Sequence, residues 1–513
     1  MKVHDRADQG ALSGNRSRSA PRWRRLLTLA LTCIVMVPLA ACLPPTPGEP
    51  GGPGGPAPGP AADLSQELTG GNGAFIGTAI PVDLAQAGYV QHEYAATGTA
   101  TSYQAVGGLS TDGRWNFQPD TTAPYRTRVL VREPADAARL SGTVVVEWLN
   151  VSGGVDADAE WANVHEEIIR AGHIWVGVSA QRLGIEGGQV LVTLPAAGSE
   201  LAGKGLKAID PARYGSLNHP GDGFAYDIFT QVARGLRAGA AIGGTQPRKI
   251  IAAGQSQSAF AMVTYYNGVQ PLTGAFDGFY VHSRGASSLP LVGAGQNAEL
   301  TSALLAGSTA TFRTDQAAPV MDVQAESDLT SILGSAKARQ PDSDRFRLWE
   351  VAGTAHADAH LLGANAQNVD CGAPINDGPL HVVLKAALHA LEGWLTTGQP
   401  PAAAPRITTD DGLFPSVRRD ADGIALGGVR TPPVDVPAVV LSGDPGPKLS
   451  PICLLIGSTK PLDASRLAAL YPSRADYEQR YAAGIEAAIG AGFVLTDDRS
   501  ALAAYARPDL VAG

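Results

Sequence analysis

The sequence has little of several features that mark particular classes of protein. Its 513 residues include only four cysteines, and neither a Cys-x-x-Cys pair nor a Cys/His spacing typical of zinc sites occurs. There are 39 Lys and Arg against 48 Asp and Glu, and no basic stripe is visible. Because phosphate binding needs clustered Lys and Arg, this balance argues against a nucleic-acid partner. We therefore expect no nucleic acid, no metal and no cofactor.

The N-terminal region lacks the run of about 20 apolar residues that a transmembrane helix needs. Its apolar run, residues 26–41, is 16 residues long and follows three arginines. A charged segment before a short apolar run is typical of an export signal. The run leads into Leu39-Ala-Ala-Cys42, which resembles a bacterial lipobox. We expect residues 1–41 to be a signal peptide and Cys42 to be lipidated; cleavage without a lipid is the alternative.

Residues 42–74 are rich in Pro and Gly and are expected to form a linker that holds the folded part away from a membrane. Residues 1–41 hold seven of the basic and two of the acidic residues, so the remaining chain has a net charge of −14. We expect a protein outside the cytoplasm, held at a membrane only through its lipid, or otherwise secreted. An oxidising compartment favours a disulfide between Cys371 and Cys453 over two free buried thiols.

From about residue 75 apolar strands alternate with helices, which predicts one α/β domain over 75–513. The sheet should be mainly parallel, with helices on both faces. The expected strands are 126–132, 142–149, 173–179, 249–253, 278–282, 320–324 and 346–351. The expected helices are 159–171, 226–240, 258–268 and 380–395. Loop-rich regions 184–222 and 286–318 are candidate inserted loops or a lid, and 398–513 a C-terminal extension.

A candidate nucleophile lies directly after one of these strands. The segment Gly254-Gln-Ser256-Gln-Ser258 joins a buried strand to a helix, as a nucleophile elbow requires. The sharp turn should hold Ser256 in a strained conformation with its hydroxyl above the sheet edge. Ser258 stands where glycine is usual, which weakens the match to the motif. The alternative is a plain strand-to-helix turn.

A base and an acid should follow the nucleophile along the chain. His356 lies in the loop after the strand 346–351, where it would take the Ser256 proton and pass it to the leaving group. Two carboxylates follow the preceding strand, and either could orient the imidazole. Spacing favours Asp328; Glu326 lies nearer the strand end and has the longer reach.

An oxyanion hole needs two donors aimed at the developing negative charge. One should be the backbone N–H of Gln257, directly after the nucleophile. The second should come from the glycine-rich loop after the strand 142–149, within the stretch Asn150, Val151 and Ser152. The alternative for this loop is a simple turn.

Several stretches of the sequence together resemble one known family. They are Gly254–Ala259, Val281–Gly285, Gly353–Asp358, Trp148–Gly154 and Tyr226–Gln231. The chain is similar through them to the bacterial "alpha/beta hydrolase domain-containing" serine hydrolases, from about residue 75 to the C-terminus. The resemblance implies an α/β-hydrolase fold and a Ser/acid/His triad. It implies little about substrate, because the fold hosts many chemistries.

The residues favour an enzyme that hydrolyses a small-molecule carboxylic ester, with amide cleavage as the second choice. His282 and Arg284 follow the next strand and could line the substrate pocket or fix a loop by hydrogen bonds. Two other functions remain open. One is a metal-dependent hydrolase, because His356 and His360 are spaced one helical turn apart. The other is a non-catalytic binding lipoprotein on a hydrolase scaffold. The sequence says nothing of oligomeric state.

Overall fold

The computed structural model describes residues 59–77, 80–192, 199–410, 412 and 415–512. The predicted signal peptide, Cys42 and most of the predicted linker lie outside these residues. The strands are β1 (Asp63–Glu67), β2 (Tyr89–Ala105), β3 (Phe117–Pro134), β4 (Thr143–Trp148), β5 (Ile174–Val178), β6 (Lys249–Gln255), β7 (Gly278–His282), β8 (Val320–Ala325), β9 (Phe346–Val351), β10 (Val439–Ser442) and β11 (Ser458–Pro461).

The first nine strands form one sheet in the order β1-β2-β3-β5-β4-β6-β7-β8-β9. Pairing is parallel from β5 to β9, and β1, β2 and β3 add an antiparallel edge. The predicted fold class is confirmed, and each predicted strand is found close to its expected position. β6 lies inside the sheet with β4 on one side and β7 on the other, so the elbow segment leaves from a strand that is paired on both edges.

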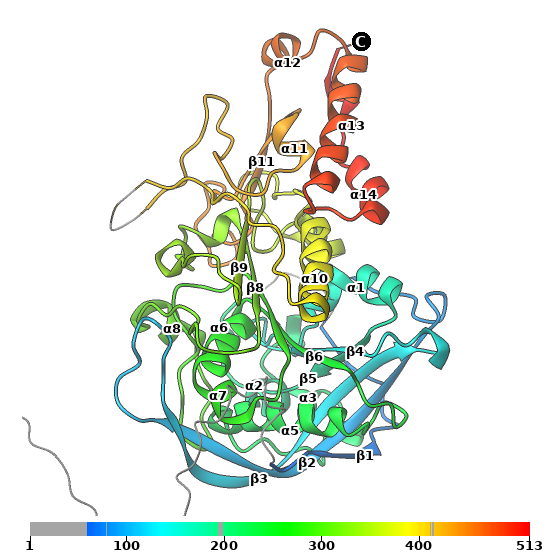
Figure 1. Cartoon of the computed structure of the whole chain (residues 1–513), viewed down its shortest axis with the longest axis vertical. Helices are drawn as coiled ribbons and strands as arrows, with labels where there is room; N and C mark the ends of the chain where they lie inside the picture. Colours follow the sequence, from blue (N-terminus) through cyan, green and yellow to red (C-terminus); the bar gives the residue numbers. More distant parts are fainter. Residues whose placement is uncertain (1–58, 78–79, 193–198, 411, 413–414, 513) are drawn as a thin grey trace, which may run out of the picture. The chain divides into compact units, whose positions relative to one another are not determined.

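Helices cover both faces of this sheet, as the apolar strands predict (Figure 1). α1 (Ala159–Ala171) and α10 (Leu380–Thr397) pack on one face, and α5 (Ala225–Arg237) and α6 (Gln257–Thr264) on the other. Side chains of β6 alternate between the two layers. Ile250 and Ala252 belong to the core under α5 and α6, whereas Ile251 and Ala253 belong to the core under α1 and α10.

The other helices lie mainly in the inserted loops and in the C-terminal extension. They are α2 (Arg182–Glu186), α3 (Leu206–Ile209), α4 (Pro211–Tyr214), α7 (Gln270–Thr273), α8 (Leu300–Ala306), α9 (Ala359–Leu362), α11 (Pro432–Asp435), α12 (Ala464–Leu470), α13 (Arg474–Gly490) and α14 (Arg499–Ala503). α13 and α14 share a small apolar core with α12 and with one residue of α10, so the extension packs on the main domain. Among the described residues no helix is both long and apolar enough to cross a membrane.

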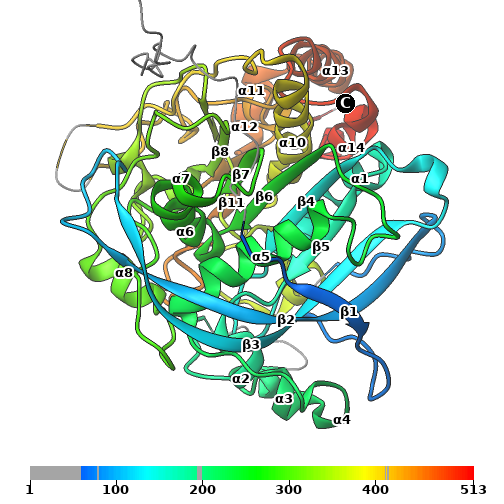
Figure 2. The same cartoon turned by 60° about the horizontal axis from the view of Figure 1, so that its bottom comes forward.

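The antiparallel edge differs from what the sequence predicts. Before residue 140 only one strand, 126–132, was expected. The structure has a long hairpin of β2 and β3 there, which runs along one side of the sheet (Figure 2). β1 lies within the predicted linker 42–74, so that linker is wrong at its C-terminal end. The five residues of β1 show no clear apolar alternation and are ordered by pairing with β2, in which Glu67 faces Tyr94.

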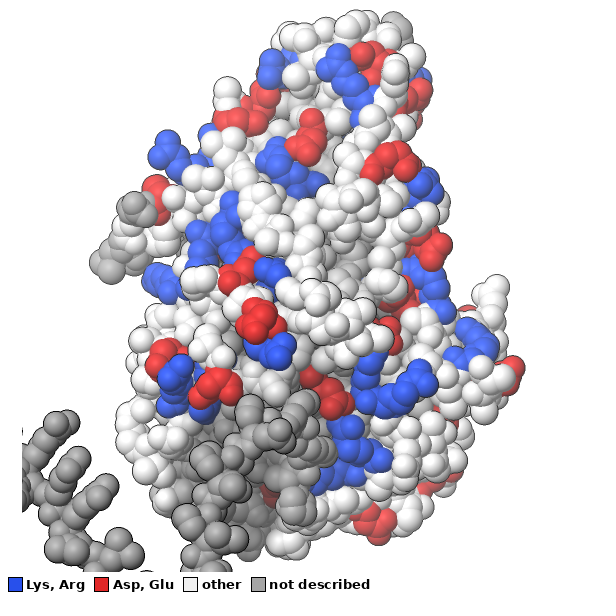
Figure 3. Space-filling model, in the orientation of Figure 1, with Lys and Arg blue, Asp and Glu red and all other residues white. Residues whose placement is uncertain are grey.

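Charged side chains of both signs are interspersed on the face shown in Figure 3. Exposed ion pairs of the described residues include Arg466 with Asp422 at 2.7 Å and Arg499 with Glu486 at 2.7 Å. Exposed pairs of this kind contribute little to stability, typically up to about 1 kcal/mol.

Candidate active site

Ser256 occupies the tight turn between β6 and α6. Its backbone has φ 57° and ψ −122°, a conformation that non-glycine residues rarely adopt. Such a residue costs about 1–3 kcal/mol and persists only where its surroundings over-determine it. Here the Ser256 N–H donates to the carbonyl of His282 at 3.0 Å, and the Phe260 N–H donates to the Ser256 carbonyl at 3.1 Å. The turn thus holds the Ser256 side chain away from the helix.

The small residues around Ser256 have different roles in this turn. A Cβ at Gly254 would lie 2.8 Å from the carbonyl oxygen of Ser258, so the strand and the helix approach closely only without one. Ser258, where glycine is usual, fits fully buried, and its hydroxyl has no hydrogen-bond partner among the described residues. The departure from the usual motif therefore leaves the turn itself intact.

His356 and Asp328 lie in line with Ser256. The Ser256 Oγ is 2.8 Å from His356 Nε2, and His356 Nδ1 is 2.8 Å from Asp328 Oδ1. Asp328 ends a short helical turn, Glu326–Asp328, directly after β8, and His356 lies in the loop after β9. Since β6, β8 and β9 run parallel in one sheet, their carboxyl ends meet at the same edge and bring the three side chains together.

Asp328 is held by two further donors on its second carboxylate oxygen. The Ser283 hydroxyl and the Ala325 N–H each donate to Oδ2 at 2.7 Å. The His356 N–H in turn donates to the Ser327 hydroxyl at 2.8 Å. Neither Ser283 nor Ser327 was singled out from the sequence. Ser283 stands between two residues that were, and only the end of β7 beside β8 reveals its contact.

Glu326, the alternative acid, faces away from His356. Its two oxygens accept from the N–H groups of Gly353 and Gly443 at 2.7 and 2.8 Å, and Arg419 Nη2 lies 2.7 Å from Oε1. Burial raises the pKa of Glu326, and Arg419 opposes that shift. Glu326 thus joins three separate loops, and of the two carboxylates only Asp328 contacts the imidazole.

The predicted oxyanion loop lies beside the elbow. The Asn150 side chain donates to the Gln255 carbonyl at 3.0 Å and accepts from the Ser152 N–H at 2.8 Å. That contact occupies the Ser152 N–H, which was one of the proposed donors. The Val151 N–H donates to no acceptor among the described residues. Gln257 is the first residue of α6, so its N–H has no partner within the helix.

His282 and Arg284 do not line the cavity next to Ser256, contrary to one of the two readings of the sequence. Arg284 is buried; it pairs with Asp322 at 2.7 Å and donates to the carbonyls of Gly285, Ala310 and Ala338. It therefore fixes loops, which was the alternative reading. The end of β7 is too deep in the sheet for either side chain to reach substrate.

His282 lies instead among buried acids. Its Nδ1 is 3.6 Å from Glu160 Oε2, and neither ring nitrogen has a hydrogen-bond partner among the described residues. Burial raises the pKa of Asp358 to about 7, although the Leu361 N–H and the nearby His282 oppose the shift. Burial, then the charge of Glu160, raise the pKa of Glu147 well above its usual value.

His356 and His360 do not form a pair. His356 faces Ser256, whereas the His360 ring stacks on that of His381 with centroids 3.7 Å apart, and its Nε2 is 3.4 Å from the Ala162 carbonyl. The described residues contain no group of three His, Cys, Asp or Glu side chains that could hold a metal ion. The one-turn spacing in the sequence therefore brings no second ligand to His356.

A cavity of about 400 Å³ opens beside Ser256 and His356. Its walls come from the loop after β4, from both inserted regions, from the loop after β9 and from the C-terminal extension. Ser256 itself is only 7% exposed, so a reacting group must enter this cavity to reach its hydroxyl. The inserted regions therefore lie over the site, as the sequence predicts.

The raised pKa of Asp358 predicts a pH-dependent stability. Between about pH 4 and pH 7 the folded protein keeps a proton on Asp358 that the unfolded chain has lost, so the free energy of unfolding falls as pH rises. Asp358→Asn keeps an acceptor for the Leu361 N–H, which Asp358 Oδ1 accepts at 2.8 Å. The free energy of unfolding of the variant, relative to that of the wild type, should rise by ~1.4 kcal/mol per pH unit in that window and stay constant above it. Urea unfolding of both proteins at pH 5 and pH 8 measures this. An equal difference in free energy of unfolding at the two pH values would contradict the prediction.

A family model agrees with this architecture. The model of the family described as "Alpha/beta hydrolase domain" matches residues 57–504. A search of curated proteins finds no match. Among solved structures, an α/β serine hydrolase without a lid from Xanthomonas campestris is similar at 12% identity, with 57% of this chain and 95% of that chain covered and a TM-score of 0.29.

Two further structures are similar at the same low level. A fungal esterase from Rhizomucor miehei has 12% identity over 59% of this chain and 86% of that chain, with a TM-score of 0.31. A glucuronoyl esterase from Solibacter usitatus has 10% identity over 47% and 55%, with a TM-score of 0.21. At these values the assignment rests on the family model, which spans most of the sequence. The chain belongs to the α/β hydrolase domain family.

Proposed function

We propose that this α/β hydrolase is a serine hydrolase that cleaves carboxylic esters through an acyl-enzyme on Ser256. The observation that carries the proposal is the chain of two 2.8 Å contacts from Ser256 through His356 to Asp328, at a strained turn beside a cavity. A serine hydroxyl is a weak nucleophile until a base takes its proton. Here the base is within reach and is itself oriented by a buried carboxylate.

In the proposed reaction His356 Nε2 accepts the Ser256 proton as Oγ attacks the carbonyl carbon of the ester. The carbonyl oxygen becomes an oxyanion, which accepts from the N–H groups of Gln257 and Val151. The intermediate collapses, the C–O bond to the alcohol breaks, and the leaving oxygen takes the proton from His356. A water then gives its proton to His356 and attacks the acyl-enzyme, which releases the carboxylic acid and returns the proton to Ser256.

Replacing the nucleophile tests the proposal. Ser256→Ala should lower kcat on p-nitrophenyl esters by at least ~10³-fold, because among the described residues the hydroxyl at His356 Nε2 is that of Ser256. A fluorophosphonate probe should label the wild type at Ser256 and leave the variant unlabelled. Ser335→Ala is a matched control, because Ser335 is buried and lies outside the cavity. If the folded wild type is labelled but turns over neither esters nor amides, the proposed hydrolysis is excluded.

The two carboxylates after β8 should separate in activity and stability. Asp328→Asn should lower kcat/KM by ~10³–10⁴-fold with little loss of structure, because the imidazole loses the acceptor that fixes its tautomer. Glu326→Gln should keep kcat within a few-fold but lower the melting temperature, because two buried N–H groups and Arg419 lose a charged acceptor. Steady-state kinetics and thermal unfolding of both variants measure this; the reverse pattern would reassign the acid.

We further propose that the protein is exported and anchored by a lipid on Cys42. The lipobox-like sequence supports this, and the disulfide between Cys371 and Cys453 suits an oxidising compartment. The protein isolated from its native membranes should have an N-terminal peptide that begins at Cys42 and carries acyl chains, which mass spectrometry detects. An unmodified N-terminus at another residue would show ordinary signal-peptide cleavage.

A further inference from the structure

The cavity beside Ser256 is lined almost entirely by neutral side chains. Aliphatic residues from separate segments form its walls, among them Ile76, Leu300, Ile332, Leu361, Ile452 and Leu455. Asp158 and His356 are the only ionisable side chains on its wall among the described residues. The Asp158 carboxylate is already paired with buried Arg132 at 2.7 Å. The cavity therefore offers no cation to a charged acyl group.

One wall of the cavity consists of two loops, 357–365 after His356 and 451–455 from the C-terminal extension. The Ala357 N–H, next to His356, donates to the Leu455 carbonyl at 3.2 Å. Leu361, Leu362 and Ile452 contribute side chains to the same wall. This wall thus depends on a contact between segments that lie almost 100 residues apart in the sequence.

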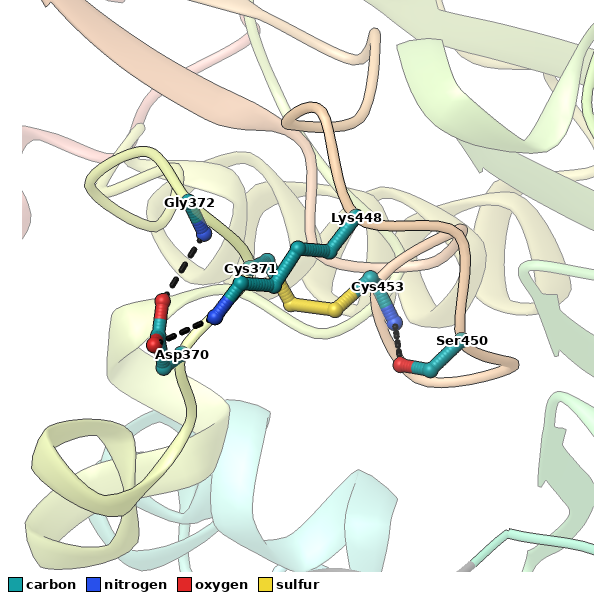
Figure 4. The surroundings of a disulfide bond; sticks show 6 residues. All are labelled: Asp370, Cys371, Gly372, Lys448, Ser450 and Cys453. Carbon is teal, nitrogen blue, oxygen red and sulfur yellow. Dashed lines mark hydrogen bonds and ion pairs between the residues drawn. A yellow bond between two sulfur atoms is a disulfide. The ribbon is translucent and has the colours of Figure 1, made fainter.

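A disulfide joins the segments that carry this wall. Cys371 and Cys453 are bonded, with Cα atoms 5.5 Å apart (Figure 4). In the sequence Cys453 lies between the lining residues Ile452 and Leu455. Both sulfurs belong to a small apolar cluster with Ala357, Leu362 and Ile456. Beside the bond, the Lys448 N–H donates to the Cys371 carbonyl at 3.3 Å, and the Lys448 ammonium pairs with the exposed Asp370 carboxylate at 2.5 Å. Loss of the bond would leave the wall held only by non-covalent contacts, such as the hydrogen bond from the Ala357 N–H to the Leu455 carbonyl.

We infer that the cavity binds the apolar chain of a neutral ester of medium length, and that the Cys371–Cys453 disulfide holds the wall against which this chain packs. The inference rests on the proposed ester hydrolysis at Ser256 and names its substrate class. An apolar cavity with few polar groups near the reacting atom is the usual form of a small-molecule site. Ile452 and Leu455 are then specificity-determining residues and not part of the bond-making machinery.

Burial of the chain should appear as a chain-length profile. Each methylene moved from water into the cavity raises kcat/KM about fourfold, equivalent to ~0.8 kcal/mol. The wild type should therefore cleave p-nitrophenyl octanoate with kcat/KM at least ~30-fold above that for the acetate. A p-nitrophenyl hemisuccinate, whose acyl group is charged, should react at least ~10-fold more slowly than the butyrate. A flat or falling profile, or preference for the hemisuccinate, would overturn the inference.

The wall is tested with matched variants of one loop. Ile452→Ser should lower the octanoate-to-acetate ratio of kcat/KM at least fivefold. Leu449→Ser makes the same change on a side chain that is 75% exposed and outside the cavity, and should leave the ratio unchanged. An unchanged ratio in Ile452→Ser, or an equal fall in both variants, would contradict the assigned wall.

The disulfide is tested on the same two esters. Cys371→Ser/Cys453→Ser, and the wild type treated with dithiothreitol, should both lose octanoate turnover at least fivefold more than acetate turnover. If the double variant does not fold, the reduced wild type still gives the comparison. Fluorophosphonate labelling of Ser256 separates the two proposals. Labelling with no chain-length effect overturns this inference alone, whereas no labelling and no ester turnover overturns the proposed function.

Discussion

The strained backbone at Ser256 is the constraint on which the site depends, and the sheet is what maintains it. β6 is paired on both edges, so its end cannot shift to relieve the turn. The next strand repeats the device, because Ser283 at the end of β7 also has a positive φ of 56°. One serine faces His356 and the other faces Asp328. Two adjacent strand ends thus present hydroxyls to the two ends of the same hydrogen-bonded chain.

The short segment after β7 supports the site in three ways. The His282 carbonyl accepts from the Ser256 N–H, the Ser283 hydroxyl donates to Asp328, and Arg284 ties the loop at Ala310 to that at Ala338. Buried charges elsewhere have the same organising role. Glu326 gathers two loop N–H groups and Arg419, and it lies two residues before Asp328. Such groups are costly to bury and are retained here where loops must keep fixed positions.

The C-terminal extension contributes to the cavity as well as to stability. Its segment 448–459 runs along the loop after His356, through the disulfide and through hydrogen bonds from Ala357 to Leu455 and from Asn376 to Ile456. The extension thereby completes a wall that the parallel sheet and its helices leave open. The bond constrains a loop that has little secondary structure of its own, which is where a covalent link restricts motion most.

The sequence by itself determined the α/β order, the parallel strands, the tight turn at Ser256 and the place of His356 after β9, because apolar runs and the strand–turn–helix context are local signals. Periodicity could not reveal β1 and most of β2, whose order comes from pairing with distant residues. Only the tertiary structure separated Asp328 from Glu326, because two carboxylates two residues apart point to different partners once the turn is formed. Only the tertiary structure likewise showed that His282 and Arg284 lie too deep to meet substrate. The cavity walls also depend on it, because they come from loops that folding alone brings together.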